Sequence, residues 1–249
     1  KVRFGVVGLG NMGSGHTRNL FEGKIPGAVL TAVCDIKPDR LDWARGVCGD
    51  SVAYFADSHE MIKSGLVDAV MIATPHYFHP IIGIDAFENG LNVLSEKPIG
   101  VYTKSIYPFM EAAKKSGKAF GIMYNQRTNK LYQKMREMVK DGSLGELKRC
   151  VWIITDWYRT QAYYNSGGWR ATWAGEGGVL LNQCPHNLDL WQWIFGMPSS
   201  IYANCEYGKY HDIEVEDDVT AMAKYPNGAT GVFITTTGEF PGTNRQIGR

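Results

Sequence analysis

A glycine-rich turn near the N-terminus has the spacing of a phosphate-binding loop. Gly8, Gly10 and Gly13 form the pattern GxGxxG between an apolar run, residues 2–7, and the start of a helical pattern. In that setting Gly8 permits a tight turn, Gly10 lets a phosphate approach the backbone, and Gly13 lets the helix pack against the strand. The helix N-terminus would then present N–H groups to a pyrophosphate. Because turns between strands and helices favour glycine for their own sake, the motif alone does not decide.

An acidic residue follows at the distance that a dinucleotide site requires. Asp35 ends the next apolar run, residues 29–34, and lies 22 positions after Gly13. Its carboxylate could accept hydrogen bonds from both ribose hydroxyls of an adenosine, and its charge would repel a 2′-phosphate. The sequence therefore predicts a dinucleotide site that favours NAD over NADP. Lys37 and Arg40 lie close by and leave NADP open.

A lysine and two histidines follow later apolar runs of the same half. Lys97 comes directly after residues 92–95, at the edge where ligands bind in a parallel sheet. A lysine there could exchange a proton with a reacting hydroxyl, and the alternative is an ordinary surface lysine. His76 and His79 follow the apolar run 67–73. We interpret both as helix-start or core residues rather than as groups with a direct chemical role.

A helix predicted over residues 178–195 carries an amide, an imidazole and a carboxylate. Asn182, His186 and Asp189 fall at i, i+4 and i+7, so we expect them to share one face opposite an apolar stripe. A neutral imidazole can accept a proton from a hydroxyl, which makes His186 a candidate base. The alternative is an ordinary solvated face. Cys184 and His186 lack further ligands at metal-binding spacing, so no metal site is predicted.

Aromatic and arginine side chains crowd the stretch 157–173. Aromatic rings stack on sugar faces, and guanidinium groups donate to hydroxyl or carboxylate oxygens. The stretch is therefore a candidate carbohydrate-binding surface. An oligomer interface, which also favours these residue types, is the alternative. The residues are Trp157, Tyr158, Arg159, Tyr163, Tyr164, Trp169, Arg170 and Trp173.

The spacing of apolar residues predicts two domains of different architecture. Short apolar runs alternate with helical patterns over residues 1–124, which predicts an α/β domain with a doubly wound parallel sheet. Residues 125–249 are predicted to form an α+β domain with a mostly antiparallel sheet. Its elements are helices over 131–139 and 178–195, strands over 146–157 and 201–207, and a hairpin over 219–236. Since Gly248 and Arg249 follow closely on the hairpin, we expect the natural chain to continue.

The overall composition excludes several classes of protein. The chain has 249 residues, of which 20% are charged and 44% hydrophobic, with 26 basic and 25 acidic side chains. This balance gives no electrostatic reason to expect a nucleic acid or a membrane as partner. No apolar run approaches the roughly 18 residues of a membrane span. Five widely spaced cysteines without a CxxC pair indicate reduced thiols and a cytoplasmic protein.

Taken together, these motifs resemble those of the Gfo/Idh/MocA family, named after glucose-fructose oxidoreductase, inositol dehydrogenase and rhizopine catabolism. The resemblance covers the whole chain. It implies an N-terminal Rossmann domain and a C-terminal domain whose open sheet builds homodimers or homotetramers. It also implies hydride transfer between NAD(P) and a secondary hydroxyl or keto group of a sugar, polyol or glycoside. The motifs that carry it are residues 8–13, Ala73-Thr74-Pro75 with His79, Glu96-Lys97-Pro98, Gly168-Trp169-Arg170, and Gly177-Gly178 running into residues 186–189.

The resemblance assigns roles to individual residues. Lys97 is expected beside the nicotinamide and the substrate hydroxyl, and His186 is expected to act as acid or base. Asn182 stands where the family often has an aspartate, which puts a proton relay through that position in doubt. The expected cofactor-binding residues are Gly8, Gly10, Asn11, Met12, Gly13, Asp35, Ile36, Arg40, Ala73, Thr74, Pro75, His79, Glu96, Lys97 and Asn125. The expected substrate-binding residues are Lys97, Trp157, Tyr158, Arg159, Trp169, Arg170, Asn182 and His186.

The resemblance leaves two other functions open. Some relatives use a tightly held NAD to oxidise a glycoside transiently, eliminate the aglycone and reduce the product again, so that no net NADH forms. Others are non-catalytic regulators or scaffolds that bind a dinucleotide. The presence of both Lys97 and His186 argues against the second of these functions.

Overall fold

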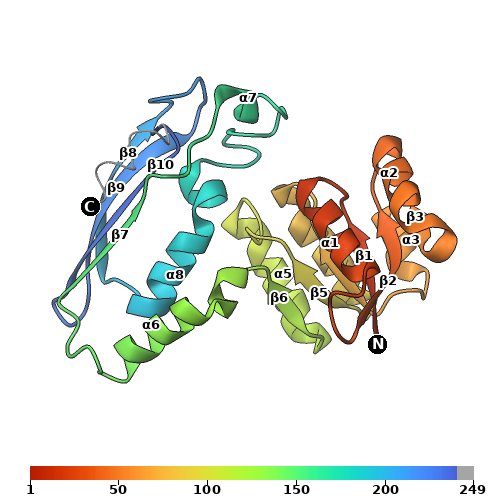
Figure 1. Ribbon diagram of the computed structural model, residues 1–249, viewed down its shortest axis with the longest axis horizontal. Helices are drawn as coiled ribbons and strands as arrows, with labels where there is room; N and C mark the ends of the chain where they lie inside the picture. Colours follow the sequence, from red (N-terminus) through yellow and green to blue (C-terminus); the bar gives the residue numbers. More distant parts are fainter. Residues whose placement is uncertain (240–249) are drawn as a thin grey trace. The chain divides into compact units, whose positions relative to one another are not determined.

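The computed structural model describes residues 1–239 and divides the chain into two compact units (Figure 1). The first unit comprises Lys1–Met123, and the second begins at Tyr124. Each unit has an apolar core of its own. Gly248 and Arg249, on which the expected continuation of the chain depends, lie outside the described residues.

The first unit is built on a six-stranded parallel sheet with the strand order β3-β2-β1-β4-β5-β6. This order, which changes direction between β1 and β4, is that of a Rossmann fold and confirms the predicted fold class. The strands are β1 (Val2–Val7), β2 (Ala28–Cys34), β3 (Ala53–Phe55), β4 (Ala69–Ile72), β5 (Asn92–Ser95) and β6 (Phe120–Ile122). The helices are α1 (Asn11–Phe21), α2 (Pro38–Cys48), α3 (Ser58–Lys63), α4 (His79–Glu88) and α5 (Thr103–Ser116).

Helices cover both faces of this sheet. Leu20 of α1 and Leu41 of α2 are buried against one face. On the other face, Met61 of α3 and Phe87 of α4 share a core with Phe109 of α5. A strand that is covered on both sides must be apolar at nearly every position, and all four residues of β4 are buried. This double cover explains why short apolar runs predicted the strands.

The second unit is built on a mixed four-stranded sheet with the order β7-β10-β9-β8. β10 runs parallel to β7 and antiparallel to β9, and β9 runs antiparallel to β8. The strands are β7 (Arg149–Ile154), β8 (Ser200–Tyr207), β9 (Glu216–Lys224) and β10 (Thr230–Thr236). The helices are α6 (Lys130–Lys140), α7 (Gln161–Tyr164) and α8 (Pro185–Phe195). α8 lies along one face of the sheet, where Trp191 and Phe233 share the core (Figure 1).

Two predicted elements of this unit differ from the structure. The strand predicted over 146–157 is shorter, because β7 comprises only Arg149–Ile154. The helix predicted over 178–195 is divided: a π-helical turn, Val179–Gln183, precedes Cys184, and α8 begins at Pro185. Proline has no N–H to donate within a helix, so it is accommodated where a helix begins. Asn182 and His186 therefore do not lie in one continuous α-helix.

Gly83 of α4 provides a test of the packing between α4 and α5. A Cβ at this position would lie 2.2 Å from the ring of Phe109, which is fully buried. We expect Gly83→Ala to lower the free energy of unfolding by about 1–3 kcal/mol. The control is Gly46→Ala in α2, where a Cβ meets nothing within 4 Å, and alanine should stabilise the helix by up to about 1 kcal/mol. Urea denaturation measures both, and equal stabilities would contradict this packing.

Candidate functional site

The turn after β1 requires glycine at two positions because protein atoms crowd them. Gly8 has a φ of +89°, and a Cβ there would lie 2.7 Å from the carbonyl oxygen of Ala73. A Cβ on Gly13 would come within 1.7 Å of the carbonyl oxygen of Gly8. Gly10 differs, because, apart from its two neighbours in the chain, no described residue has an atom within 4 Å of a Cβ built on it. Packing within the protein therefore does not require glycine at position 10, whereas a phosphate against the backbone would.

The N-terminus of α1 has the features of an anion site. Gly10 is the N-cap residue and provides no side-chain cap, and the first turn contains no acidic residue. The N–H groups of this turn lack intrahelical acceptors, and the positive end of the helix dipole lies beside them. Asn11 and Met12 are exposed at this end. The residues present therefore fit the pyrophosphate of a dinucleotide.

Asp35 is held against the glycine turn. One carboxylate oxygen accepts the N–H of Leu9 at 2.6 Å, and the other accepts the N–H of Lys37 at 2.9 Å. These bonds fix the carboxylate at the carboxyl end of β2, where the dinucleotide fingerprint places its acidic residue. Ile36 and Arg40 are both exposed nearby. Their contacts with a cofactor stay predictions.

His79, one of the predicted cofactor-binding residues, is fully buried. Its Nδ1 lies 2.8 Å from the carbonyl oxygen of Pro98, and its Nε2 lies 2.8 Å from that of Thr74. Burial lowers the pKa of the ring, and the two carbonyl contacts oppose this effect. The side chain thus joins the loop after β4 to the loop after β5. Direct contacts of a cofactor with His79, or with Ala73, Thr74 and Pro75, stay predictions.

Lys97 follows β5 and is half-buried. Its N–H donates to Oε2 of Glu96 at 3.2 Å, and Oε1 of the same carboxylate lies 2.8 Å from Nε2 of His16 in α1. Glu96 is only 6% exposed, so these contacts stabilise its charge where water cannot. The lysine therefore extends from a main chain that is fixed at the same sheet edge as the glycine turn. His16 was not predicted from the sequence, although it lies three residues after the GxGxxG pattern.

Asp189 lies in α8, three residues after His186. Its carboxylate forms an ion pair with the guanidinium of Arg127, with contacts of 2.5 and 2.7 Å. His186 and Asp189 thus lie one turn apart on the same helix, whereas Asn182, the third residue of the predicted face, lies in the π-helical turn before it. The break at Cys184 separates that turn from α8, so the helical spacing on which the shared face was predicted holds only from His186 to Asp189.

Asn182 and His186 lie on either side of this break. Asn182 is buried, and its Nδ2 donates to a carboxylate oxygen of Glu176 and, at 3.3 Å, to the hydroxyl of Tyr163. His186 lies in the first turn of α8 and is half-buried. Its ring meets the ring of Tyr124 edge to face, with centroids 5.9 Å apart. Substrate contacts of both side chains stay predictions, as does cofactor binding by the exposed Asn125.

The aromatic and arginine residues of the stretch 157–173 stack on one another. The ring of Tyr163 has the guanidinium groups of Arg159 and Arg170 each 4.5 Å from its centroid. Arg159 also lies 5.1 Å from the ring centroid of Trp157, and Arg170 lies 4.7 Å from that of Trp169. Part of their stacking surface is thus used within the protein. Trp157 remains 51% exposed, and sugar binding by this group stays a prediction.

Glu176 is a buried carboxylate that the sequence patterns did not single out. It is 1% exposed and accepts hydrogen bonds from Arg170 at 2.9 Å and from the N–H of Ala171 at 3.2 Å. Since it also accepts from Asn182, it fixes the orientation of that amide. The loop that contains Glu176 has no regular spacing of apolar residues from which a site could be predicted. The one available signal was that Glu176 is the only acidic residue between positions 157 and 188.

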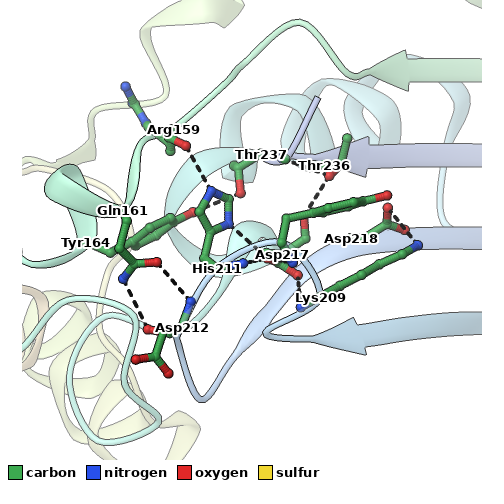
Figure 2. Close-up of polar contacts among 12 residues, drawn as sticks. Arg159, Gln161, Tyr164, Lys209, His211, Asp212, Asp217, Asp218, Thr236 and Thr237 are labelled. Carbon is green, nitrogen blue, oxygen red and sulfur yellow. Dashed lines mark hydrogen bonds and ion pairs between the residues drawn. The ribbon is translucent and has the colours of Figure 1, made fainter. Parts of the chain in front are cut away.

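A second buried carboxylate anchors the segment that carries Arg159 (Figure 2). Asp217 is fully buried and accepts hydrogen bonds from the main-chain N–H groups of residues 209–211. It also lies 2.9 Å from Nδ1 of His211, whose Nε2 is 2.9 Å from the carbonyl oxygen of Arg159. The loop before β9 and the segment after β7 are thereby joined at one imidazole.

Two family models match the chain over almost its whole length. Residues 2–124 match the model described as "Oxidoreductase family, NAD-binding Rossmann fold", and residues 132–247 match the "GFO/IDH/MocA C-terminal domain". The chain belongs to the GFO/IDH/MocA oxidoreductase family. Its first unit is therefore an NAD-binding Rossmann domain. The predicted family and the predicted cofactor, NAD, are confirmed.

Several similar proteins are dehydrogenases of sugar-like compounds. The WlbA dehydrogenase of Chromobacterium violaceum, solved with NADH and UDP-GlcNAcA, is 31% identical over 97% of this chain and 68% of its own, with a TM-score of 0.90. The scyllo-inositol dehydrogenase of Lactobacillus casei, solved with NAD(H) and scyllo-inositol, is 25% identical over 95% of this chain and 69% of its own, with a TM-score of 0.79. The myo-inositol 2-dehydrogenase of Thermotoga maritima is 28% identical over 99% of this chain and 72% of its own length. The inositol 2-dehydrogenase of Arthrobacter sp. is 34% identical over 59% of this chain, and the match spans 43% of that protein's own length.

The part of the chain that the structure describes shows neither a metal-ligand cluster nor a membrane-spanning helix. Residues 1–239 contain no cluster of three or more His, Cys, Asp or Glu side chains that could hold a metal ion. No helix among them is long and apolar enough to cross a membrane. The five cysteines are free thiols, and Cys205 is less buried than the other four.

Substitutions at Gly10 and Gly13 test cofactor binding and folding stability separately. We expect Gly10→Ala to change the free energy of unfolding by less than about 0.5 kcal/mol but to raise the Kd for NADH at least about tenfold, because its methyl group obstructs the pyrophosphate. Gly13→Ala should destabilise the protein by about 1–3 kcal/mol or more, because its Cβ overlaps the main chain of Gly8. Fluorescence titration with NADH and urea denaturation measure the two effects. Unchanged NADH binding by G10A would contradict the phosphate site.

Proposed function

We propose that the protein transfers a hydride between NAD and a secondary hydroxyl or keto group of a sugar, polyol or glycoside. The observation that carries this proposal lies at the carboxyl edge of the first sheet. The dinucleotide-binding turn follows β1, Lys97 follows β5, and only β4 separates these two strands. Ligands of open α/β sheets bind at this edge, close to the point where the strand order changes direction.

Two side chains act on the substrate hydroxyl in this proposal. His186 takes the proton of the substrate hydroxyl, because a neutral imidazole is an effective base near neutral pH. Lys97 donates a hydrogen bond to the same oxygen and stabilises the negative charge that develops on it. NAD, when bound, accepts the hydride of the carbinol carbon. The alcohol thus loses one proton and one hydride and becomes a ketone, and the reverse steps reduce a keto group.

The relatives support a substrate with several secondary hydroxyl groups. The WlbA structures hold UDP-GlcNAcA, and the Lactobacillus casei structure holds scyllo-inositol. Both compounds carry the group that this reaction oxidises. Asp35 favours NAD in the proposal, and Lys37 with Arg40 leaves NADP as an alternative cofactor. Five free thiols support a reducing, cytoplasmic location.

A glycosidase that works by transient oxidation is the second candidate. One relative favours it: the glycosyl hydrolase family 109 protein of Shewanella woodyi is 26% identical over 69% of this chain and 39% of its own length. In that reaction NAD is reduced and reoxidised within one cycle, so that an aglycone is released without net NADH. The third candidate, a non-catalytic regulator, gives no role to Lys97 and His186.

Substitution of the two proposed catalytic residues tests the dehydrogenase. Lys97→Met and His186→Asn should each lower kcat at least about 100-fold and change the Kd for NADH less than about threefold, because both act on the substrate oxygen. The control is Lys118→Met, which removes an exposed lysine of the first unit. Titration with NADH and NADPH, followed by nicotinamide fluorescence with a panel of sugars, inositols, glycosides and nucleotide sugars, measures these quantities.

The outcomes of this experiment separate the three candidates. Net NADH formation with one class of carbohydrate supports the dehydrogenase and identifies its substrate class. Release of an aglycone without a lasting change in fluorescence supports the glycosidase. Binding of NADH with no turnover of any compound supports the regulator. Near-normal turnover by K97M would remove Lys97 from its proposed role.

One face of the second sheet carries a row of exposed apolar side chains. Val151 of β7, Val232 of β10, Met222 of β9 and Tyr202 of β8 lie in register across the four strands. Val151, Met222 and Tyr202 are 52%, 59% and 76% exposed. The core residues of β7, β10 and β9 alternate with this row and point to the opposite face, against α8. We propose that this row joins copies of the chain into a homodimer or homotetramer, as exposed apolar patches do at subunit interfaces.

A charge in the middle of this row tests the assembly. Met222→Glu should raise the dissociation constant of the oligomer at least about 100-fold, because an unpaired carboxylate in an apolar interface costs several kcal/mol. The control is Asn19→Glu, at an exposed position of α1. Light scattering after size-exclusion chromatography gives the mass of both variants across a dilution series. A monomeric wild-type protein, or an M222E protein of unchanged mass, would contradict this interface.

A further inference from the structure

The main chain around Lys97 is held from two sides by histidines of other elements. Nε2 of His16 in α1 lies 2.8 Å from Oε1 of Glu96, and Nδ1 of His79, the first residue of α4, lies 2.8 Å from the carbonyl oxygen of Pro98. Lys97 is the single residue between these two anchored positions. We propose that His16 and His79 are positioning residues that fix Lys97 for its reaction, an inference that rests on the proposed hydride transfer.

His16 controls the position of Glu96. The carboxylate is almost removed from water, and such a charge is stable only while donors surround it. One donor is the N–H of Lys97, at 3.2 Å, and His16 provides the contact to the other oxygen. Loss of the imidazole leaves that oxygen without its partner, so the carboxylate must move or take up a proton. Either change alters the hydrogen bond between the carboxylate and the N–H of Lys97, and it therefore shifts the main chain of Lys97.

His79 controls the other side of the same segment. Its two ring nitrogens lie against the carbonyl oxygens of Pro98 and Thr74, and a neutral ring donates to one of them and packs against the other, so the ring sets the separation of the loops after β5 and β4. The ring is fully buried, and no solvent molecule can readily replace both contacts. The segment 96–98 is therefore fixed at each end before any substrate binds, which is the preorganisation that a charge-stabilising lysine needs.

His16 also connects Lys97 to the helix that receives the cofactor. It lies on α1, one turn beyond the N–H groups that fit a pyrophosphate. A single contact between an imidazole and a carboxylate thus joins the cofactor-binding helix to the residue that acts on the substrate. A shift of α1 relative to β5 is transmitted to Lys97 through this contact, whereas the binding of NAD itself does not require it.

The test compares a conservative with a disruptive substitution of His16. His16→Gln retains an N–H donor that can reach Glu96, and His16→Leu does not. We expect His16→Leu to lower kcat about 10- to 100-fold, as small displacements of a catalytic group do, with the KM and the Kd for NADH changed less than about threefold. His16→Gln should restore kcat to within about threefold of the wild type.

A readout that needs no substrate separates this proposal from the proposed function. The rate of reductive methylation of Lys97, measured by mass spectrometry relative to that of Lys118, reports the environment of its amine. We expect His16→Leu and His79→Phe to change this ratio at least about threefold, and His16→Gln to change it less than about twofold. If the wild-type protein oxidises no carbohydrate, the proposed hydride transfer fails, and the labelling ratios alone still decide whether the histidines position Lys97.

A matched control and a double-mutant cycle complete the design. His59→Leu breaks another histidine-carboxylate contact of the first unit, in which Nδ1 of His59 lies 2.9 Å from Asp85, and should leave kcat and the labelling ratio unchanged. In a Glu96→Gln background, His16→Leu should have less than about a third of its effect, since its partner is already altered. Equal behaviour of H16L and H16Q, or additive effects of the His16 and Glu96 substitutions, would overturn the proposal.

Discussion

The close contact between the glycine turn and the loop after β4 is the constraint on which the rest of the first unit depends. Gly8 and Gly13 allow the main chains of the turn, of α1 and of Ala73 to approach more closely than any side chain would permit. That approach places the N-terminus of α1 at the carboxyl edge of β1 and β4, where the strand order changes direction. Asp35 strengthens the same turn from β2 by accepting the N–H of Leu9. The cofactor site is therefore a consequence of how closely the backbone packs in this fold.

Buried and half-buried carboxylates organise the irregular segments of both units. Glu96 joins α1 to the loop after β5, and Asp35 joins β2 to the glycine turn. In the second unit, Glu176 joins its loop to Arg170 and the π-helical turn, while Asp217 gathers the N–H groups of residues 209–211. A buried charge is costly unless donors surround it, so each carboxylate imposes the conformation that brings its donors together. Loops without apolar periodicity are given a definite geometry in this way.

Local signals made part of this protein predictable from its sequence. The apolar runs identified the strands of the first sheet because helices cover both of its faces, and the GxGxxG spacing identified the turn because crowding at Gly8 and Gly13 admits only glycine. Contacts between distant residues left no such signal. Arg127 pairs with Asp189 across 62 positions, a contact that helical spacing could not reveal. Pro185 was the available indication that the helix is divided, because a proline inside a predicted helix marks a break or a new start.

The stacked arginines of the second unit bear on how the proposed carbohydrate would be selected. The guanidinium groups of Arg159 and Arg170 each lie 4.5 Å from the ring centroid of Tyr163. They also donate hydrogen bonds to Gln183 and Glu176, respectively. A guanidinium has five N–H donors, so those not used in these bonds are held in fixed directions. Fixed donors distinguish hydroxyl groups by their position around a ring, whereas mobile cations mainly attract charge. Under the proposed function, selection in this unit would therefore depend on the stereochemistry of the sugar, and the buried Glu176 would contribute to it by holding the guanidinium of Arg170 in place.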